Sequence, residues 1–138
     1  MKTSAGIVFI YDNKILLVHP TNAPWFGLHN IPKGIVEEDE TIFEAAIREV
    51  KEEVGLDYYE LDKEKIDREA KEIYYTDKKG KAYKKVYYYV VHLNSVEHEI
   101  IPKENLQLEE VNWAGFLDYE EASKRLFWRF KEILNYIK

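Results

Sequence analysis

The stretch that decides the fold runs from residue 34 to residue 56 and reads GIVEEDETIFEAAIREVKEEVGL. Thr41 and Glu44 have the spacing of a helix N-terminal capping box, and Gly55 is typical of a helix end. Between these signals, apolar residues recur at helical spacing, at Phe43, Ala46, Ile47, Val50 and Val54. The stretch therefore predicts a loop that leads into one amphipathic helix.

Three acids, Glu49, Glu52 and Glu53, lie at positions i, i+3 and i+4 of this helix, so their carboxylates share one patch. Their mean direction lies roughly 140° around the helix from the apolar set, and we expect them to face away from the core. Like charges at this spacing repel, and a divalent cation is the simplest compensation. The alternative is an ordinary solvated face rich in Glu and Lys.

Carboxylate oxygens suit Mg²⁺ or Mn²⁺, and Mg²⁺ keeps coordination positions for water and substrate phosphates. A bound metal lowers the pKa of water, which a spare carboxylate can then deprotonate. Arg48, next to Glu49, fits the role of orienting that carboxylate. The pattern thus favours metal-assisted attack of water on a phosphate.

Residues 34–56 fit the pattern G-x5-E-x7-R-E-U-x-E-E-x-G-U, in which x is any residue and U is an aliphatic one. Every fixed position matches, from Gly34 at the start to Leu56 at the end. By composition alone this match would arise with odds on the order of one in a million or rarer. The segment resembles the Nudix box of the Nudix hydrolases. The resemblance implies an α/β fold, an α/β/α sandwich around a mixed β-sheet, with residues 1–138 as a single domain.

The resemblance also implies hydrolysis of a phosphoanhydride in a nucleotide, with water as nucleophile and Mg²⁺ or Mn²⁺ as cofactor. Glu52 and Glu53 correspond to metal ligands, and Glu49 to a ligand or the general base. Arg48 corresponds to the group that orients Glu49, and Glu40 to a brace between loop and helix. The catalytic set is therefore Glu49, Arg48 and Glu52.

The residues Ile31-Pro32-Lys33-Gly34 resemble the entrance to the box in the diadenosine tetraphosphate hydrolases of the family. That resemblance implies that Lys33 contacts the polyphosphate. Gly34 would let the backbone approach the metal and phosphates closely. The alternative for Lys33 is a loop lysine that points to water.

The segment from Tyr83 to Val90 resembles the strand in which the same hydrolases present a lysine and, four residues later, a tyrosine to substrate. Lys84 and Tyr88 match this spacing and would share one face of a strand. Tyr74, 18 residues after Leu56, matches a tyrosine of the same branch. Strands favour aromatic residues in any case, so each tyrosine can equally be part of the sheet packing.

In relatives, a further metal ligand often comes from the C-terminal side of the sheet. Glu109 and Glu110, before Trp113, are the candidates, and Glu109 is favoured. The alternative is a solvated loop acid.

The flanking elements follow from residue periodicity and turn chemistry. A long loop is expected over residues 20–34, and an irregular or briefly helical segment over 57–69. A final helix should begin at Asp118, with its last apolar residue at Ile137. The expected strands span residues 5–10 and 15–19 (a hairpin), 70–76 and 82–93 (a second hairpin), and 111–116.

The composition, 46% hydrophobic and 33% charged residues, excludes disordered and fibrous proteins. The chain has no cysteine, so disulfides and thiol catalysis are also excluded. A formal net charge of −6 argues against binding nucleic acid or anionic membranes by bulk electrostatics. No apolar run approaches membrane-spanning length, and we expect a cytoplasmic protein.

These observations favour a small-molecule nucleotide substrate, most of all a dinucleoside polyphosphate such as diadenosine tetraphosphate. The alternatives are a nucleoside-triphosphate pyrophosphatase, a pyrophosphohydrolase of RNA 5′ ends, and a non-catalytic nucleotide sensor. Lys78, Lys79 and Lys81, interleaved with tyrosines, keep the RNA alternative open. The sequence gives no oligomeric state.

Overall fold

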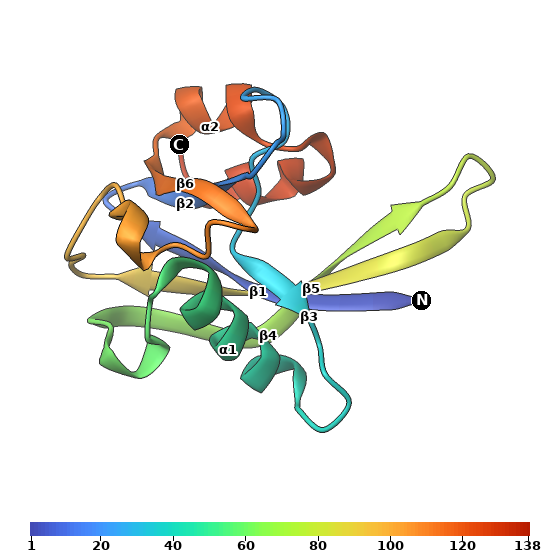
Figure 1. Cartoon of the computed structure of the whole chain (residues 1–138), viewed down its shortest axis with the longest axis horizontal. Coiled ribbons are helices and arrows are strands. Elements are labelled where there is room, and N and C mark those ends of the chain that lie inside the picture. The colour runs from blue at the N-terminus through green and yellow to red at the C-terminus, as the bar shows by residue number, and fades with distance from the viewer.

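The computed structural model of the protein describes all residues, 1–138, as one six-stranded sheet with helices on both faces (Figure 1). The strands are β1 (Lys2–Tyr11), β2 (Lys14–Pro20), β3 (Lys33–Ile35), β4 (Lys63–Thr76), β5 (Ala82–Leu93) and β6 (Val111–Leu117). The α-helices are α1 (Ile42–Val54) and α2 (Tyr119–Arg125). Three 3₁₀ segments complete the set, η1 (Tyr58–Glu60), η2 (Lys103–Asn105) and η3 (Trp128–Tyr136).

The strand order is β4-β5-β1-β2-β6, with β3 paired to β1. The central pair β1–β5 is parallel and every other pair is antiparallel. The predicted mixed sheet is therefore confirmed. In Figure 1 the β4–β5 hairpin projects from the body of the molecule beside the N-terminus.

Strand β3 fills an opening between β1 and β2. These two strands pair only next to their turn, at Ile10–Ile15 and Tyr11–Lys14. Further along, β1 pairs with β3 instead, and Gly6 of β1 lies opposite Lys33. A Cβ at Gly6 would overlap the Pro32 carbonyl oxygen, so this close approach requires glycine. The loop predicted over residues 20–34 thus ends in a short strand anchored in the middle of the sheet.

Two hydrophobic cores lie on the two faces of the sheet, because side chains alternate along each strand. Ile7 and Phe9 of β1 pack with α1, whereas Val8 and Ile10 pack with α2 and η3. The predicted α/β/α sandwich is confirmed. Neither α1 nor α2 has the length and apolar character needed to cross a membrane, nor does any other helix.

Helix α1 begins and ends as predicted. The Glu44 backbone N–H donates to Thr41 Oγ1 at 3.1 Å, and the Thr41 N–H donates to Glu44 Oε1 at 2.8 Å, which completes the capping box. At the other end, Gly55 adopts a left-handed φ of 75° and donates to the Lys51 carbonyl at 3.0 Å. Both ends are set by local sequence.

The segment 57–69, predicted as irregular or briefly helical, fits that prediction only in its first part. The short helix η1 lies there, but β4 already begins at Lys63, where no strand was predicted. The strand lies at the edge of the sheet, carries charged residues and has register shifts between Lys63 and Lys65 and between Asp67 and Lys71. A bulged, charged edge strand lacks the two-residue periodicity on which the prediction relied.

The prediction of a single C-terminal helix is also wrong, because α2 ends at Arg125 and the separate 3₁₀ segment η3 starts at Trp128. Between them, the Phe127 N–H donates to the His29 carbonyl at 2.9 Å, and the His29 N–H donates to the Arg125 carbonyl at 2.9 Å. These bonds to the loop before β3 replace helical bonds. A contact with a distant segment therefore interrupts a locally continuous helical pattern.

Candidate active site

Arg48 lies at the centre of the acidic face of α1. Its Nε and Nη2 donate to the two Glu40 carboxylate oxygens at 2.9 and 2.6 Å. Its Nη1 donates to Glu49 at 2.8 Å and to Glu52 at 3.2 Å, and Nη2 also donates to the Ile35 carbonyl at 3.0 Å. These bonds, led by those to Glu40, raise the pKa of Arg48 and lower that of Glu40. One guanidinium thus joins the end of β3 to three acids.

Glu40 links the loop to the helix in the structure, in the position predicted for a brace. Its Oε1 also accepts the Glu37 backbone N–H at 2.8 Å. Because the carboxylate is held by Arg48 on one side and by the loop backbone on the other, it fixes how residues 35–40 approach α1.

The Glu49 carboxylate lies directly over Gly34. A Cβ on residue 34 would overlap the carboxylate carbon and both of its oxygens, so the carboxylate keeps this position only beside a glycine. Burial raises the pKa of Glu49, against the opposing hydrogen bond and charge of Arg48. The structure therefore joins Gly34, Arg48 and Glu49 in one unit.

Glu53 departs from the expected orientation. Its exposed fraction is 8%, so the prediction that all three acids face away from the core is wrong for this residue. Burial raises the pKa of Glu53, and the charges of Glu49 and Glu110 raise it further, against the opposing charge of Lys33. Glu53 is buried because β3 packs beside α1 and covers this side of the helix.

Lys33 and Lys84 come together beside these acids. Burial lowers the pKa of Lys33, and so does the nearby charge of Lys84, while Glu53 and Glu49 oppose the shift. Lys84 is half-buried, and its pKa is also lowered by burial. Two residues predicted to bind phosphate, 51 positions apart in the chain, thus share one region because β3 and β5 both pair with β1.

The acid that reaches this cluster from the C-terminal side is Glu110. Its charge raises the pKa of both Lys33 and Glu53. The structure thus favours Glu110 over the predicted Glu109. Adjacent residues of a turn point in different directions, which the sequence could not resolve.

The donor set fits a hard divalent cation, because Glu49, Glu52, Glu53 and Glu110 offer carboxylate oxygens only. The absence of a side chain at Gly34 lets the Glu49 carboxylate lie against β3, which adds one of these donors to the set. As the side chains stand, no three acidic or histidine groups are gathered closely enough to hold an ion. Arg48 holds Glu49 and Glu52 in their present positions.

Tyr88 is placed differently from the prediction. It does share a face of β5 with Lys84, but η3 covers that face here, and Tyr88 is 1% exposed. Its hydroxyl donates to Glu132 at 2.7 Å, and burial raises its pKa. The ring has no free face for a base, so the substrate-binding role of Tyr88 is not supported by its position.

Tyr74 also lies apart from the lysine pair. It is exposed, its hydroxyl donates to Glu72 at 3.1 Å, and its ring lies 5.3 Å from Lys85 Nζ. Because neighbouring residues of a strand face opposite ways, Tyr75 and not Tyr74 is on the side of Lys84. The structure thus does not bring Tyr74 to the other candidate residues.

Sequence reasoning missed Tyr75, which pairs with Lys84 across the β4–β5 hairpin. Lys84 Nζ lies 4.9 Å from the Tyr75 ring centroid, and the Arg129 guanidinium carbon lies 5.2 Å from it. The Phe127 and Tyr83 rings lie 5.8 and 6.2 Å away. No signal in the sequence marks this pair, because a register shift between Tyr75 and Thr76 brings Tyr75 opposite Lys84, where a regular hairpin would place Tyr74.

The family comparison matches a NUDIX domain over residues 1–136. Nudix hydrolase 2 of Arabidopsis thaliana is 30% identical over 139 residues, which cover 99% of this chain and 46% of that protein. An ADP-ribose pyrophosphatase of Methanocaldococcus jannaschii is 53% identical over 45 residues, or 33% of this chain and 27% of that protein. The chain therefore spans less than half the length of these curated relatives.

Among solved structures, a C. elegans Ap4A hydrolase binary complex superimposes with a TM-score of 0.74 at 26% identity. The match covers 98% of this chain and 93% of that one. The superposition extends over the sheet and both helical layers, far beyond residues 34–56. From the domain match together with the geometry of its glutamate-bearing helix, we conclude that the chain belongs to the NUDIX domain family.

Proposed function

We propose that the protein hydrolyses a phosphoanhydride bond of a dinucleoside polyphosphate, such as diadenosine tetraphosphate, with the help of Mg²⁺ or Mn²⁺. The observation that carries this proposal is the convergence of Lys33 and Lys84 beside Glu49 and Glu53, with Tyr75 against Lys84. Acids for a metal, two cations for a phosphate chain and an aromatic ring thus occur in one continuous region.

Glu49, Glu52, Glu53 and Glu110 are the residues that would hold the metal. When bound, the ion would neutralise phosphate charge and acidify water. Arg48 keeps the Glu49 carboxylate in place, which suits Glu49 for accepting a proton from water. Lys33 and Lys84 would attract and orient the polyphosphate.

The relatives support this substrate class to different degrees. The Ap4A hydrolase of C. elegans matches along nearly the whole of both chains. The match to the ADP-ribose pyrophosphatase of M. jannaschii covers a third of this chain. The residues that we propose for substrate binding are spread over β3 and β5, so the longer match has more weight for the substrate.

The proposal is tested by product analysis. The purified protein would be incubated with Mg²⁺ and diadenosine tetraphosphate, and separately with the common nucleoside triphosphates and with 5′-triphosphorylated RNA. We expect diadenosine tetraphosphate to be cleaved into ATP and AMP, with a higher kcat/KM than any other substrate.

Other outcomes would contradict the proposal in distinct ways. Monophosphate and pyrophosphate from triphosphates alone would identify a nucleoside-triphosphate pyrophosphatase. Cleavage of RNA ends alone would identify an RNA pyrophosphohydrolase. Binding of nucleotide without hydrolysis of any substrate would identify a sensor.

A further inference from the structure

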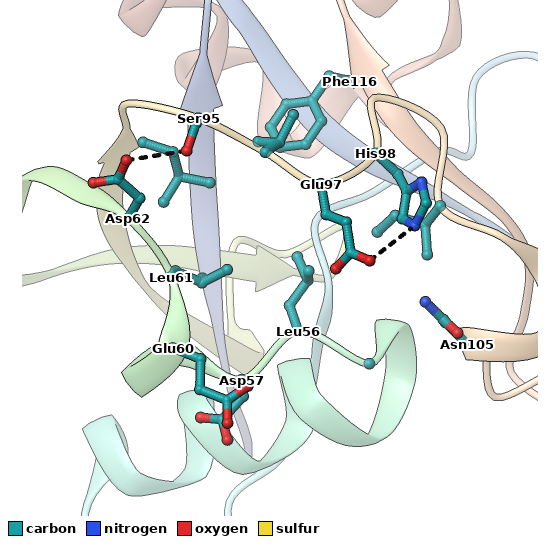
Figure 2. Close-up of a pocket in the computed structure, with 14 residues that line it drawn as sticks. Leu56, Asp57, Glu60, Leu61, Asp62, Ser95, Glu97, His98, Asn105 and Phe116 are labelled. Atoms are coloured by element: carbon teal, nitrogen blue, oxygen red, sulfur yellow. Dashed lines mark hydrogen bonds and ion pairs between the residues drawn. The ribbon is translucent and has the colours of Figure 1, made fainter.

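A cavity of about 260 Å³ lies where α1 ends, between η1 and the segment that follows β5 (Figure 2). Its apolar wall is formed by Leu56, Leu61, Leu93, Val96, Ile101 and Phe116. Leu56, Leu61 and Val96 are only partly buried, so the cavity exposes aliphatic surface to solvent. None of the residues to which we assign catalysis or phosphate binding lines it.

The polar rim of this cavity is acidic. Asp57 and Asp62 already have partners, since Asp57 accepts the Tyr59 N–H at 3.0 Å and Asp62 accepts the Ser95 hydroxyl at 3.0 Å. Glu60 and Glu97 are exposed and form no ion pair with a lysine or arginine. The contact of Glu97 is with His98, at 3.5 Å. Glu60 thus has no charged partner, and Glu97 has only His98, so both carboxylates at the mouth can meet a cation.

The end of α1 adds to the negative potential. Gly55 lines the cavity and follows the last residue of this 13-residue helix, whose C-terminal end has a partial negative charge. A phosphate would be repelled here by both the helix end and the carboxylates. The cavity therefore favours a cationic ligand, whereas Lys33 and Lys84 suit an anionic substrate.

We propose that this cavity binds a small organic cation of the alkyl amine class. The aliphatic chain would lie on Leu56, Leu61 and Val96, and ammonium groups would meet the carboxylates of Glu60 and Glu97. Figure 2 shows Glu97 on one side of Leu56 and Glu60 on the other. Sites for drug-sized ligands occupy roughly 300–1,000 Å³, so a smaller molecule than a nucleotide fits this cavity.

The test is calorimetric titration of the full chain with 1,5-diaminopentane at low ionic strength. We expect saturable binding at one site, at least tenfold weaker binding of the neutral analogue 1,5-pentanediol, and at least tenfold weaker binding of the diamine to a Glu60→Gln/Glu97→Gln variant. A Val96→Trp variant, in which the larger side chain fills the cavity, should lose binding.

The matched control is a Glu69→Gln/Glu120→Gln variant, which removes the same charge from exposed positions elsewhere. It should bind the diamine as the unmodified protein does. Equal weakening in both double variants would show a general effect of net charge and overturn the proposal. Absence of saturable binding, or equal affinity for the diol, would overturn it as well. Unchanged circular dichroism of each variant establishes that it is folded.

Discussion

At the residue scale, the site depends on how tightly Glu49 is held. It lies between Gly34, whose missing side chain leaves room for the carboxylate, and Arg48, which donates to it at 2.8 Å. Arg48 can do this while binding Glu40 because a guanidinium presents several donors in a fixed plane. The carboxylate that we propose for catalysis is thus oriented by a residue on its own helix and by a glycine on a neighbouring strand.

Replacing Glu49 by Gln keeps the shape of the side chain but removes the negative charge and the proton acceptor. If Glu49 is the base, we expect kcat to fall by about 10²–10⁴-fold. Steady-state hydrolysis of the identified substrate would measure it. Glu38→Gln, an exposed acid of the same segment, should have near-normal kcat. Near-normal turnover of Glu49→Gln would exclude it from the chemistry.

Gly34→Ala tests the contact between β3 and α1. The added Cβ would overlap the Glu49 carboxylate, so the carboxylate or the strand must move. We expect at least a tenfold loss of kcat/KM, because small displacements of reacting groups have large effects on rate. Gly80→Ala, where nothing lies near the added Cβ, is the control, and it should leave activity unchanged. Full activity of Gly34→Ala would argue against this packing.

Lys84→Ala tests phosphate binding. Lys84 lies beside Lys33, whereas Lys85 forms a hydrogen bond to the Tyr87 hydroxyl at 2.8 Å on the other face of the strand. We expect Lys84→Ala to raise KM by about tenfold with a smaller change in kcat, since a charge-assisted contact is lost. Lys85→Ala should leave KM unchanged. Equal effects of the two variants would remove Lys84 from the site.

At the element scale, α1 is defined by local signals at both ends and by packing along its length. Its N-terminal capping box and its left-handed Gly55 would be compatible with many folds. Its position is specific, because the Gln107 N–H donates to the Glu53 carbonyl at 2.9 Å and Asn105 packs against Gly55. The helix end is therefore also a tertiary contact.

Gly55→Ala measures that contact. Both Gly55 and Gly80 have a positive φ, of 75° and 80°, so alanine should cost about 1 kcal/mol at either position. At Gly55 the added Cβ would also lie 3.0 Å from the Asn105 carbonyl oxygen, while Gly80 has open space. Urea unfolding should therefore show a larger loss of stability for Gly55→Ala. Equal losses would mean that Asn105 moves aside freely.

At the scale of the whole molecule, backbone hydrogen bonds of His29 join the loop before β3 to Arg125 of α2 and to Phe127, next to η3. His29 is fully buried, and its ring centroid lies 4.9 Å from those of His19 and Trp25. Both of its ring nitrogens lack a hydrogen-bond partner. Burial lowers the pKa of His29 to about 4, and the charges of His19 and Arg125 add to this effect.

This burial predicts a pH dependence of folding. The unfolded chain binds a proton at His29 below the ordinary histidine pKa of 6.5, whereas the folded protein does so only below about 4. Stability should therefore fall as the pH decreases from 6.5 to 4, by about 3 kcal/mol at most from this residue. Urea midpoints measured between pH 7.5 and pH 4.5 would show it.

His29→Phe keeps an aromatic ring and removes the proton site. The variant should lose less stability on acidification than the unmodified protein does. His98→Phe, at a solvent-exposed histidine, should leave the dependence on pH as it is. If His29→Phe responds to pH as the unmodified protein does, other groups cause the dependence.

Prediction from the sequence succeeded where the interactions are short in range. The ends of α1, the hairpin of β1 and β2, and the alternation that places Lys84 and Tyr88 on one face all depend on residues a few positions apart. It failed at Tyr88 because η3, more than 40 residues away in the chain, covers it. It also failed for the final helix, where bonds to His29 replace helical ones.

The sequence by itself determined the family-specific segment, the helix that bears the acids, and the alternation of strand side chains between the two faces of the sheet. These features depend on local spacing and residue chemistry. Only the tertiary structure decided that Glu53 is buried, that the charge of Glu110 acts on Glu53, and that Tyr75 lies against Lys84. Each of these depends on which strands become neighbours. Strand order is set by the burial of both faces at once, a property of the whole chain and not of any one segment.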